Sequence, residues 1–380
     1  MSQKRSIFEE VAEKKAPEKP VTGAIDKAPK GARKAIRVWL VILFAMVMAM
    51  IVVGGLTRLT DSGLSITEWK PVTGAMPPMS APEWQSEFEK YQEIPEYQLQ
   101  NKGMSLEEFK FIYWWEWGHR QLGRMIGLVW ALGFLGFAVS RKIPTGWAGR
   151  LFLIGALGGL QGAIGWWMVS SGLSGDRLDV ASYRLATHLG LAFVILGFIA
   201  WYIFLLGRPE RDLMQARRGK EAKLFSLSTG LLHATFIQIL LGALVAGIDA
   251  GRSFTDWPLM AGSFVPQGAL ELTPLWTNFF ENAGLVQFMH RIWAYLLLIF
   301  AIVVWRRGRA SAHGKTRFAF NALMAALLLQ VVLGVMTVLY IAPWQLAITH
   351  QIVAVLVWVL MLRARFLAHY PLSTSIRETK

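Results

Sequence analysis

Four histidines occupy matched positions in the two halves of this 380-residue chain. The string GHRQLGR around His119 resembles MHRIWAY around His290, and ATHLGLAF around His188 resembles ITHQIVAV around His350. The members of the two pairs lie 69 residues apart (119 to 188) and 60 residues apart (290 to 350). Two imidazoles on facing membrane helices supply the axial ligands that a haem iron needs. The repeat therefore predicts two haem sites, one in each half.

Two other roles stay open for these histidines. Zinc or copper needs ligands that converge on one point, and the chain has no H-x-x-H or H-E-x-x-H spacing. A single intramembrane histidine is more often a packing residue, but polar groups in lipid are costly and four at equivalent positions favour ligation. The chain has no cysteine, which excludes disulfides, thiolate-bound haem, covalent c-type haem and iron–sulfur clusters within it.

The elements that carry the histidines are predicted to be membrane helices. Hydrophobic residues make up 54% of the chain, and eight apolar stretches can cross a bilayer of about 30 Å as helices of about 20 residues. Only helices and closed barrels satisfy their backbone in lipid, and these runs are too long for barrel strands. The sequence predicts an all-α integral membrane protein. Its eight transmembrane helices are expected near residues 36–57, 121–140, 148–168, 184–207, 224–247, 284–305, 318–339 and 346–365.

The charge pattern predicts the orientation of these helices. The formal net charge is +14, but the segment from Asp61 to Glu116 holds ten acids against four lysines. By the positive-inside rule, both termini lie in the cytoplasm and the four histidines lie toward the outer side. A nucleic-acid site would gather its positive charge on one face, so no nucleic-acid binding is expected. The basic segments are Lys27 to Arg37, Arg141 to Arg150, Arg208 to Lys223, Arg306 to Arg317 and the tail from Arg363.

The first 35 residues give information on the cellular location of the protein. They are polar, rich in lysine, and contain proline and glycine, which favours a disordered cytoplasmic tail. They lack the apolar core of a signal peptide, and their glutamates suit a mitochondrial transit peptide poorly. We therefore expect a multi-pass protein of the bacterial inner membrane, with its haem sites toward the periplasm.

The internal repeat extends beyond the histidines. SITEWKP follows the first span and SFTDWP follows the fifth, and LQGAIG and LQVVLG align Gln161 with Gln330 and Gly165 with Gly334. Helices 1–4 and 5–8 are therefore predicted to form two parallel four-helix-bundle repeats. The expected parts are a cytoplasmic tail (1–35), an N-terminal half (36–207), a basic cytoplasmic linker (208–223), a C-terminal half (224–366) and a cytoplasmic tail (367–380).

The two halves differ at one charged position. Glu116 precedes His119 by three residues and shares its helix face, whereas no acid stands three residues before His290. A carboxylate beside a haem edge could take or give protons. Alternatively, Glu116 is an interfacial residue that pairs with Arg120 or Arg124. The asymmetry makes the N-terminal half the candidate active site and the other half a candidate electron-transfer site.

Arginines near the outer surface are candidate haem-propionate ligands. Arg120 and Arg291 directly follow two of the histidines, and Arg58 and Arg184 lie nearby in the predicted topology. Arginine binds carboxylates through two parallel hydrogen bonds, which suits a propionate. The alternative is that these side chains anchor helix ends at the lipid headgroups.

Several long motifs resemble one protein family. The strings GGLTRLTDSGLSITEWKPVTGAMPP, EFKFIYWWEWGHRQLGR, RLATHL, QFMHR and ITHQ together resemble the haem A synthase family, membrane enzymes of cytochrome oxidase assembly. The resemblance covers residues 36–366 and is greatest to the branch of proteobacteria and mitochondria that lacks cysteines. Other bacterial members carry a cysteine pair in the outer loop, and a thiol role proposed there cannot apply to this chain.

The resemblance implies an activity and a role for each histidine pair. Members oxidise the C8 methyl of haem O to a formyl group, making haem A for cytochrome oxidase. His119 and His188 would hold haem O or haem A in the N-terminal half, and His290 and His350 would hold haem b in the C-terminal half. The functional glutamate of the family falls on Glu116. Implied partners are haem O, haem O synthase, cytochrome oxidase assembly factors and membrane lipid.

Two other functions stay open on the sequence. A di-haem b electron-transfer protein that oxidises quinol would use the same ligands, but four histidines on one side give no electron path across the bilayer. A transporter with a histidine proton relay would bind no chromophore. Because two histidine ligands fill both axial positions of an iron, either one ligand leaves or the chemistry occurs at the porphyrin edge. The sequence leaves a homo-oligomer open.

Overall fold

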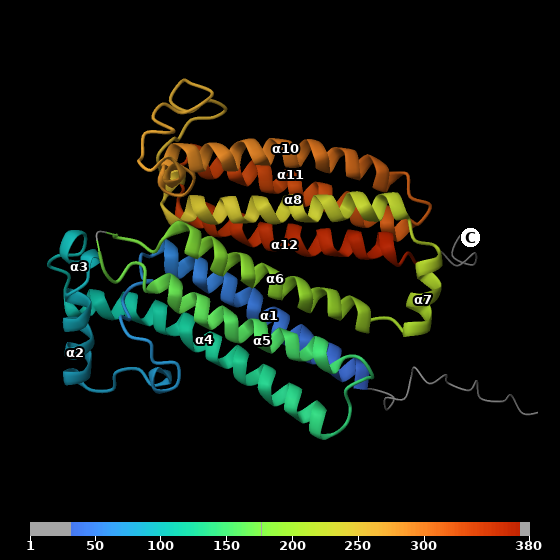
Figure 1. The fold of residues 1–380 in the computed structure, drawn as a ribbon, viewed down its shortest axis with the longest axis horizontal. Coiled ribbons are helices and arrows are strands. Elements are labelled where there is room, and N and C mark those ends of the chain that lie inside the picture. The colour runs from blue at the N-terminus through green and yellow to red at the C-terminus, as the bar shows by residue number, and fades with distance from the viewer. Residues whose placement is uncertain (1–31, 176, 373–380) are drawn as a thin grey trace, which may run out of the picture.

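The computed structural model describes residues 32–175 and 177–372, and this part of the chain is helical without a named strand. Eight of the described helices are long and apolar enough to cross a membrane, which confirms the predicted fold class. They run side by side (Figure 1). Their bounds are α1 Ala32–Leu59, α4 Leu106–Val139, α5 Ala148–Val169, α6 Ser182–Leu206, α8 Ala222–Gly247, α10 Ala283–Arg309, α11 Gly314–Leu339 and α12 Trp344–His369.

Short elements lie at the two ends of this bundle. One end, here called the loop end, carries most of them, and α7 lies at the other end with both ends of the described chain (Figure 1). The helices of the loop end are η2 Thr73–Ala75, α2 Ala81–Gln92, α3 Pro95–Leu99, η3 Ala250–Arg252, η4 Leu275–Thr277 and α9 Asn278–Glu281. The helix of the opposite end is α7 Glu210–Arg218.

Helix α4 begins much earlier than the sequence predicted. Its apolar part starts near residue 121, but a capping box at Ser105 and Glu108 starts the helix at Leu106. The Ser105 backbone N–H donates to the Glu108 carboxylate at 2.8 Å, and the Glu108 N–H donates to Ser105 Oγ at 3.3 Å. The charged first turns hid this segment from a hydropathy argument. His119 therefore lies thirteen residues into its helix (106 to 119) instead of within its first turns.

Three expected segment boundaries also need correction. Residues 32–35, expected in the N-terminal tail, form the start of α1, and residues 367–369, expected in the C-terminal tail, belong to α12. The linker expected at 208–223 contains α7. Charged residues such as Arg33 and Lys34 extend α1 beyond its apolar window, whereas α7 is a separate short helix between α6 and α8. The rest of the predicted tails, 1–31 and 373–380, lies outside the described residues.

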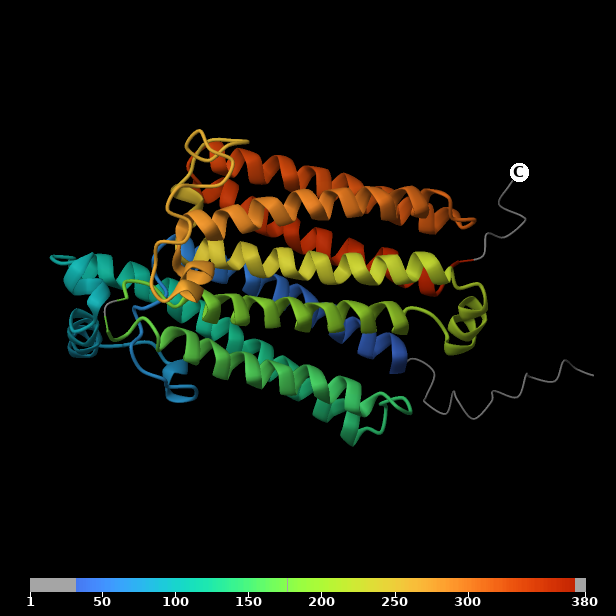
Figure 2. The same cartoon turned by 45° about the horizontal axis from the view of Figure 1, so that its top comes forward.

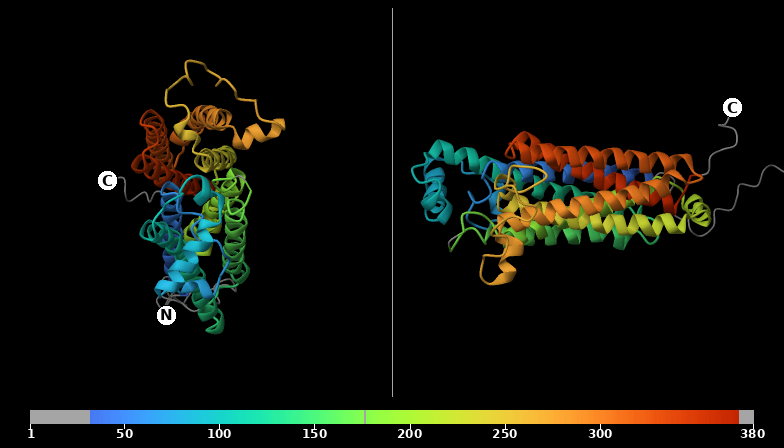
Figure 3. Two further views of the ribbon diagram at one scale, coloured as in Figure 1. Left: turned by 90° about the vertical axis from the view of Figure 1, so that its left-hand side faces the viewer. Right: turned by 90° about the horizontal axis from the view of Figure 1, so that it is seen from above.

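The spanning helices pack in two groups of four. In the first, α1 and α5 each contact both α4 and α6, and in the second, α8 and α11 each contact both α10 and α12. The helices that carry paired histidines therefore occupy opposite corners of each group (Figures 2 and 3). These contacts are the ones that two four-helix units require, and the repeat relation between the units stays a prediction.

The two groups share an interface and part of one apolar core. Helix α6 contacts α8 and α12, and α1 contacts α12. Val355, Trp358 and Leu362 of α12 belong to the core cluster of the first group, and Trp358 Nε1 donates to the Phe193 carbonyl at 3.0 Å. Close helix approach supplies van der Waals contact, which replaces the hydrophobic effect as the force between helices in lipid. The halves are thus packed into one body.

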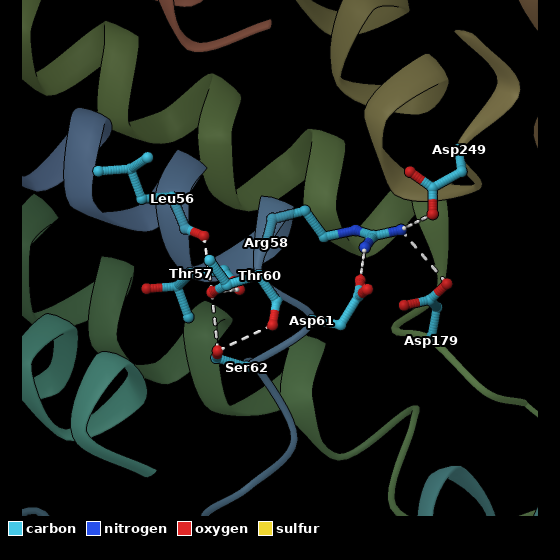
Figure 4. Close-up of polar contacts among 8 residues, drawn as sticks. All are labelled: Leu56, Thr57, Arg58, Thr60, Asp61, Ser62, Asp179 and Asp249. Atoms are coloured by element: carbon cyan, nitrogen blue, oxygen red, sulfur yellow. Dashed lines mark hydrogen bonds and ion pairs between the residues drawn. The ribbon is translucent and has the colours of Figure 1, made fainter. Parts of the chain in front are cut away.

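A buried arginine joins the two groups at the loop end (Figure 4). Arg58, near the end of α1, donates to Asp61 at 2.8 Å, to Asp179 at 3.2 Å and to Asp249 at 2.9 Å. Asp249 follows α8 in the second group, whereas the other two carboxylates belong to the first. The Arg58 side chain is only 15% exposed. Three carboxylates thus share the guanidinium of Arg58, and propionate binding by Arg58 stays a prediction.

Removing this cation should weaken the contact between the halves. Arg58→Gln leaves three carboxylates facing one another, so we expect the free energy of unfolding to fall by about 1–2 kcal/mol. Thermal unfolding in detergent measures this loss. Arg177→Gln is the matched control, because the Arg177–Glu281 pair also crosses between the groups at 3.0 Å but is more exposed. An equal loss in both variants would contradict a special role for Arg58.

Candidate functional site

The four histidines lie on four spanning helices, near the loop end. His119 is on α4 and His188 on α6 in the first group, and His290 is on α10 and His350 on α12 in the second. The rings of each predicted pair lie within electrostatic range of each other. Among the described residues, no group of three or more His, Asp or Glu side chains could hold a metal ion. This arrangement favours two pairs over a single converging metal site.

Each histidine ring packs against a glycine of a neighbouring helix. A Cβ on that glycine would lie only 2.9–3.1 Å from the ring, closer than side chains normally approach. The glycines therefore make space for the imidazoles and let the paired helices stand close to their neighbours. The pairs are Gly54 of α1 with His119, Gly165 of α5 with His188, Gly242 of α8 with His290, and Gly334 of α11 with His350.

A glutamine amide lies beside the rings in the first and second groups alike. Gln161 Nε2 lies 3.2 Å from His188 Nδ1, and Gln238 Nε2 lies 3.0 Å from His290 Nδ1. Both amides also donate to the carbonyl of the same histidine, at 2.9 and 3.1 Å. Gln330 Nε2 lies 3.2 Å from His350 Nε2. Amides from α5, α8 and α11 thus hold three of the four histidines in place.

The glutamine oxygens fit these sites to a haem. The Oε1 atoms of Gln161, Gln238 and Gln330 are buried, and no hydrogen-bond partner occurs for them in the described part of the chain. A histidine that ligates a metal through one nitrogen donates its other N–H to an acceptor, and each of these oxygens is such an acceptor. The two ends of an amide can be exchanged by a side-chain flip. The residues present therefore fit two pairs of axial ligands.

Glu116 is a buried carboxylate whose two oxygens are both bonded. Oε2 accepts from Ser65 Oγ at 2.7 Å and from the Ile66 backbone N–H at 2.8 Å, and Oε1 accepts from Arg120 Nη2 at 2.6 Å. The side chain therefore ties α4 to the SITEW segment that follows α1. The sequence left two roles open, and the ion pair with Arg120 is present. Arg124 instead donates to backbone carbonyls of the same loop. A proton-transfer role for Glu116 stays a prediction.

The second group repeats this clamp with an amide in place of the acid. Gln287, three residues before His290, donates to the Phe254 carbonyl at 3.0 Å, in the SFTDW segment. Arg291 Nη2 donates to the same carbonyl at 2.9 Å, as Arg120 Nη2 donates to the Ile66 carbonyl at 2.8 Å. The Glu116–Arg120 pair of the first group is therefore neutral overall, and the Gln287–Arg291 pair of the second group carries one positive charge. Binding of haem propionates by these arginines stays a prediction, because backbone carbonyls take several of their donors here.

A second buried acid lies beside the first group. Glu96 of α3 is 4% exposed, and its Oε2 has no hydrogen-bond partner within the described ranges. Burial raises the pKa of Glu96 to about 8, and the nearby Asp179, Glu116 and Asp61 carboxylates add to the rise. The carboxyl of Glu96 is therefore protonated at neutral pH. Nothing in the sequence pattern around Glu96 distinguished it from the surface acids of the same segment.

The sequence argument missed several residues of these sites. Gln238 and Gly242 on α8, Gly54 on α1 and Gln287 on α10 were not singled out, although each contacts a histidine or its supporting segment. A Q-x-x-x-G spacing on α5, α8 and α11 would have found Gln238 and Gly242, because it aligns Gln238 with Gln161 and Gln330. That alignment compares helices within a half as well as between halves.

The fold defines a multi-pass membrane protein in which each four-helix group carries two of the four histidines. A family model described as cytochrome oxidase assembly protein (COX15-CtaA) matches residues 37–362. The chain belongs to this family, as the motifs of the sequence indicated.

Curated relatives are similar to the chain over nearly its full length. A protein named "Heme A synthase" from Ruegeria sp. (strain TM1040) is 69% identical over 98% of this chain and 99% of its own length. Proteins of the same name from Ruegeria pomeroyi and Paracoccus denitrificans are 68% and 61% identical, each over 99% of this chain and over 100% and 99% of their own lengths. The resemblance drawn from the motifs is confirmed.

The buried carboxyl of Glu96 should make stability depend on pH. Below about pH 4.5, Glu96 is protonated in both the folded and the unfolded states. Between about pH 4.5 and 8 only the unfolded state ionises, so the stability that Glu96 contributes is lost as the pH rises through this window. Glu96→Gln cannot ionise. Relative to the native protein, we expect the free energy of unfolding of Glu96→Gln to rise by about 1–3 kcal/mol as the pH is raised from about 5 to about 9. Thermal unfolding at each pH measures this difference. The exposed Glu93→Gln is the control, and a constant difference at all pH values would refute the assignment.

Proposed function

We propose that this chain is a haem A synthase, which oxidises the C8 methyl of haem O to a formyl group. The observation that carries this proposal is the identity of 61–69% to proteins named for that activity, over nearly the whole chain. The four cradled histidines support it, because an enzyme that handles haem in a membrane needs intramembrane ligands for iron. Haem O is the substrate, delivered within the membrane by haem O synthase, and cytochrome oxidase assembly factors are the expected partners.

The first group holds the substrate and the second holds a resident haem b. His119 and His188 would ligate haem O and then haem A, and His290 and His350 would ligate haem b. The difference between the groups supports this assignment: the first has a buried carboxylate beside its histidine, where the second has the amide of Gln287. The bound haem supplies the redox chemistry of its iron. The chain supplies ligands, orientation and exclusion of water.

Glu116 is the group of this chain that handles protons near the substrate. Oxidation of a methyl carbon releases protons, and the Glu116 carboxylate lies three residues before His119 on the same helix face. Its Oε1, which is held by Arg120, would accept a proton. Because Ser65 and the Ile66 N–H donate to Oε2, the carboxylate is held against the segment that follows α1. Arg120 restrains the acid and fixes the segment that follows α1.

The protein lies in the bacterial inner membrane with both termini in the cytoplasm. Support comes from the basic residues of α7 and of the loops beside it, and from the acidic residues of the loop end. The histidine pairs then lie toward the periplasm. Because both pairs lie near one end of the bundle, they give no electron path through the bilayer. This placement favours the synthase over a di-haem carrier that oxidises quinol.

Identification of the bound pigments tests the proposal directly. The protein would be purified from a host that makes haem O, and its haems would be extracted, separated and identified by mass. We expect haem B together with haem O or haem A. His188→Ala should lose the haem O or haem A, and His350→Ala should lose the haem B. Haem B alone, at two per chain, would favour the electron carrier. A purified protein without haem would contradict both the synthase and the electron carrier.

Replacement of Glu116 tests its role in the chemistry. Glu116→Gln keeps the shape and most hydrogen bonds of the side chain, so we expect haem content to stay normal. Conversion of haem O to haem A should fall by about 100-fold, because the proton acceptor is gone. Chromatography of the haems over time measures the rate. Arg124→Gln is the control, because Arg124 bonds the adjoining loop and Gln121 and makes no hydrogen bond to Glu116. A native rate in Glu116→Gln would remove the proton role.

A further inference from the structure

One of the four histidine sites differs from the others by a single residue. Each helix that cradles a ligand histidine carries its glycine at the end of a five-residue string. The residue four positions before that glycine is glutamine in three helices and methionine in the fourth. The strings are QGAIG on α5 (161–165), QILLG on α8 (238–242), QVVLG on α11 (330–334) and MIVVG on α1 (50–54).

The methionine leaves His119 without the amide that its counterparts have. In the described part of the chain, the His119 ring makes no hydrogen bond, whereas an amide nitrogen lies beside each of the other three rings. Met50 packs against α4: its Cε would lie 3.4 Å from a Cβ on Gly123, one turn beyond His119. A thioether has no N–H or O–H to donate and is only a weak acceptor.

A ligand histidine depends on the partner of its second nitrogen. That hydrogen bond fixes the rotation of the ring and raises the basicity of the ligating nitrogen, and losing it weakens metal binding by about 10–100-fold. In the structure the amide nitrogens of Gln161, Gln238 and Gln330 lie beside the rings, and their buried Oε1 atoms have no partner in the described part of the chain. A flip of each amide would turn Oε1 toward the ring as an acceptor of this kind, which the thioether of Met50 cannot provide for His119.

We propose that His119 is the exchangeable axial ligand of the first site, and that Gln161, Gln238 and Gln330 are positioning residues that hold the other three histidines on iron. The inference rests on the proposed haem ligation and deepens it. If His119 were to leave a bound haem, the space beside it on α4 would adjoin the helix face that carries Glu116. In the second group His290 and His350 would both be retained, which would suit electron transfer.

An exchange of the two residues tests this proposal. The full-length protein with haem in both sites would be reduced and titrated with carbon monoxide, an external ligand that binds only where an axial position opens. In the native protein we expect carbon monoxide to bind the first-site haem and not the second. Met50→Gln should weaken this binding about tenfold or more, and Gln238→Met should open the second site to it. His188→Ala and His350→Ala, which each remove one haem, assign the spectra.

Matched variants separate the hydrogen bond from general damage. Met48→Gln makes the same change on a lipid-exposed position of α1, and we expect native carbon monoxide binding. Gln238→Glu keeps an acceptor oxygen and should keep the second site closed. In each variant the unchanged spectrum of the other haem reports that the bundle is folded.

Each result bears on the proposal in one direction. Carbon monoxide binding that stays native in Met50→Gln, or that occurs first at the second-site haem of the native protein, would overturn it. A protein that exchanges ligands as expected but does not convert haem O would keep this inference and end the proposed synthase. A protein without haem would fail the proposed function at the earlier pigment extraction.

Discussion

The interior of a membrane offers no water, so every polar ring placed there must find its partners within the protein. The structure meets this constraint for three of the four histidines: each histidine packs against a glycine of a neighbouring helix, but only His188, His290 and His350 also lie beside a glutamine amide from that helix. Such contacts need close helix approach, which small residues allow. The placing of the eight helices therefore follows from the needs of four imidazoles as much as from apolar packing.

Polar side chains at the loop end likewise find their partners within the protein. Arg120 and Arg291 bind the backbone of the segments that follow α1 and α8, through matched pairs of carbonyls. Glu116 and Gln287 bind the same two segments from one turn earlier. An identical scaffold is thus built with a carboxylate in one half and an amide in the other. The difference changes charge and proton affinity while the fold stays the same.

Much of this was open to prediction from the sequence, and the exceptions have physical causes. Long apolar runs and repeated strings indicated the eight spans and the four histidines. The start of α4 at Leu106 was missed because a capping box, not hydropathy, begins that helix. The Glu116–Arg120 pair was one of the roles left open by the sequence, but the backbone partners of Arg120 and Arg291 were missed because backbone carbonyls leave no trace in side-chain patterns. Gln238 was missed because each helix was compared only with its repeat partner in the other half. Gln238 is on α8, and its counterpart Gln161 is on α5, which is not the repeat partner of α8.

Helix α1 also has a mechanical consequence for the two sites. Gln351, the neighbour of His350 on α12, donates to the Ile51 carbonyl at 2.7 Å and fills the notch at Gly55. The adjacent Gly54 supports the His119 ring. Helix α1 is thus in contact with His119 of the first pair and with Gln351, the neighbour of His350 in the second pair. A displacement of α12 at His350 would therefore also move the Gln351 side chain, which contacts α1 next to the glycine that packs against His119.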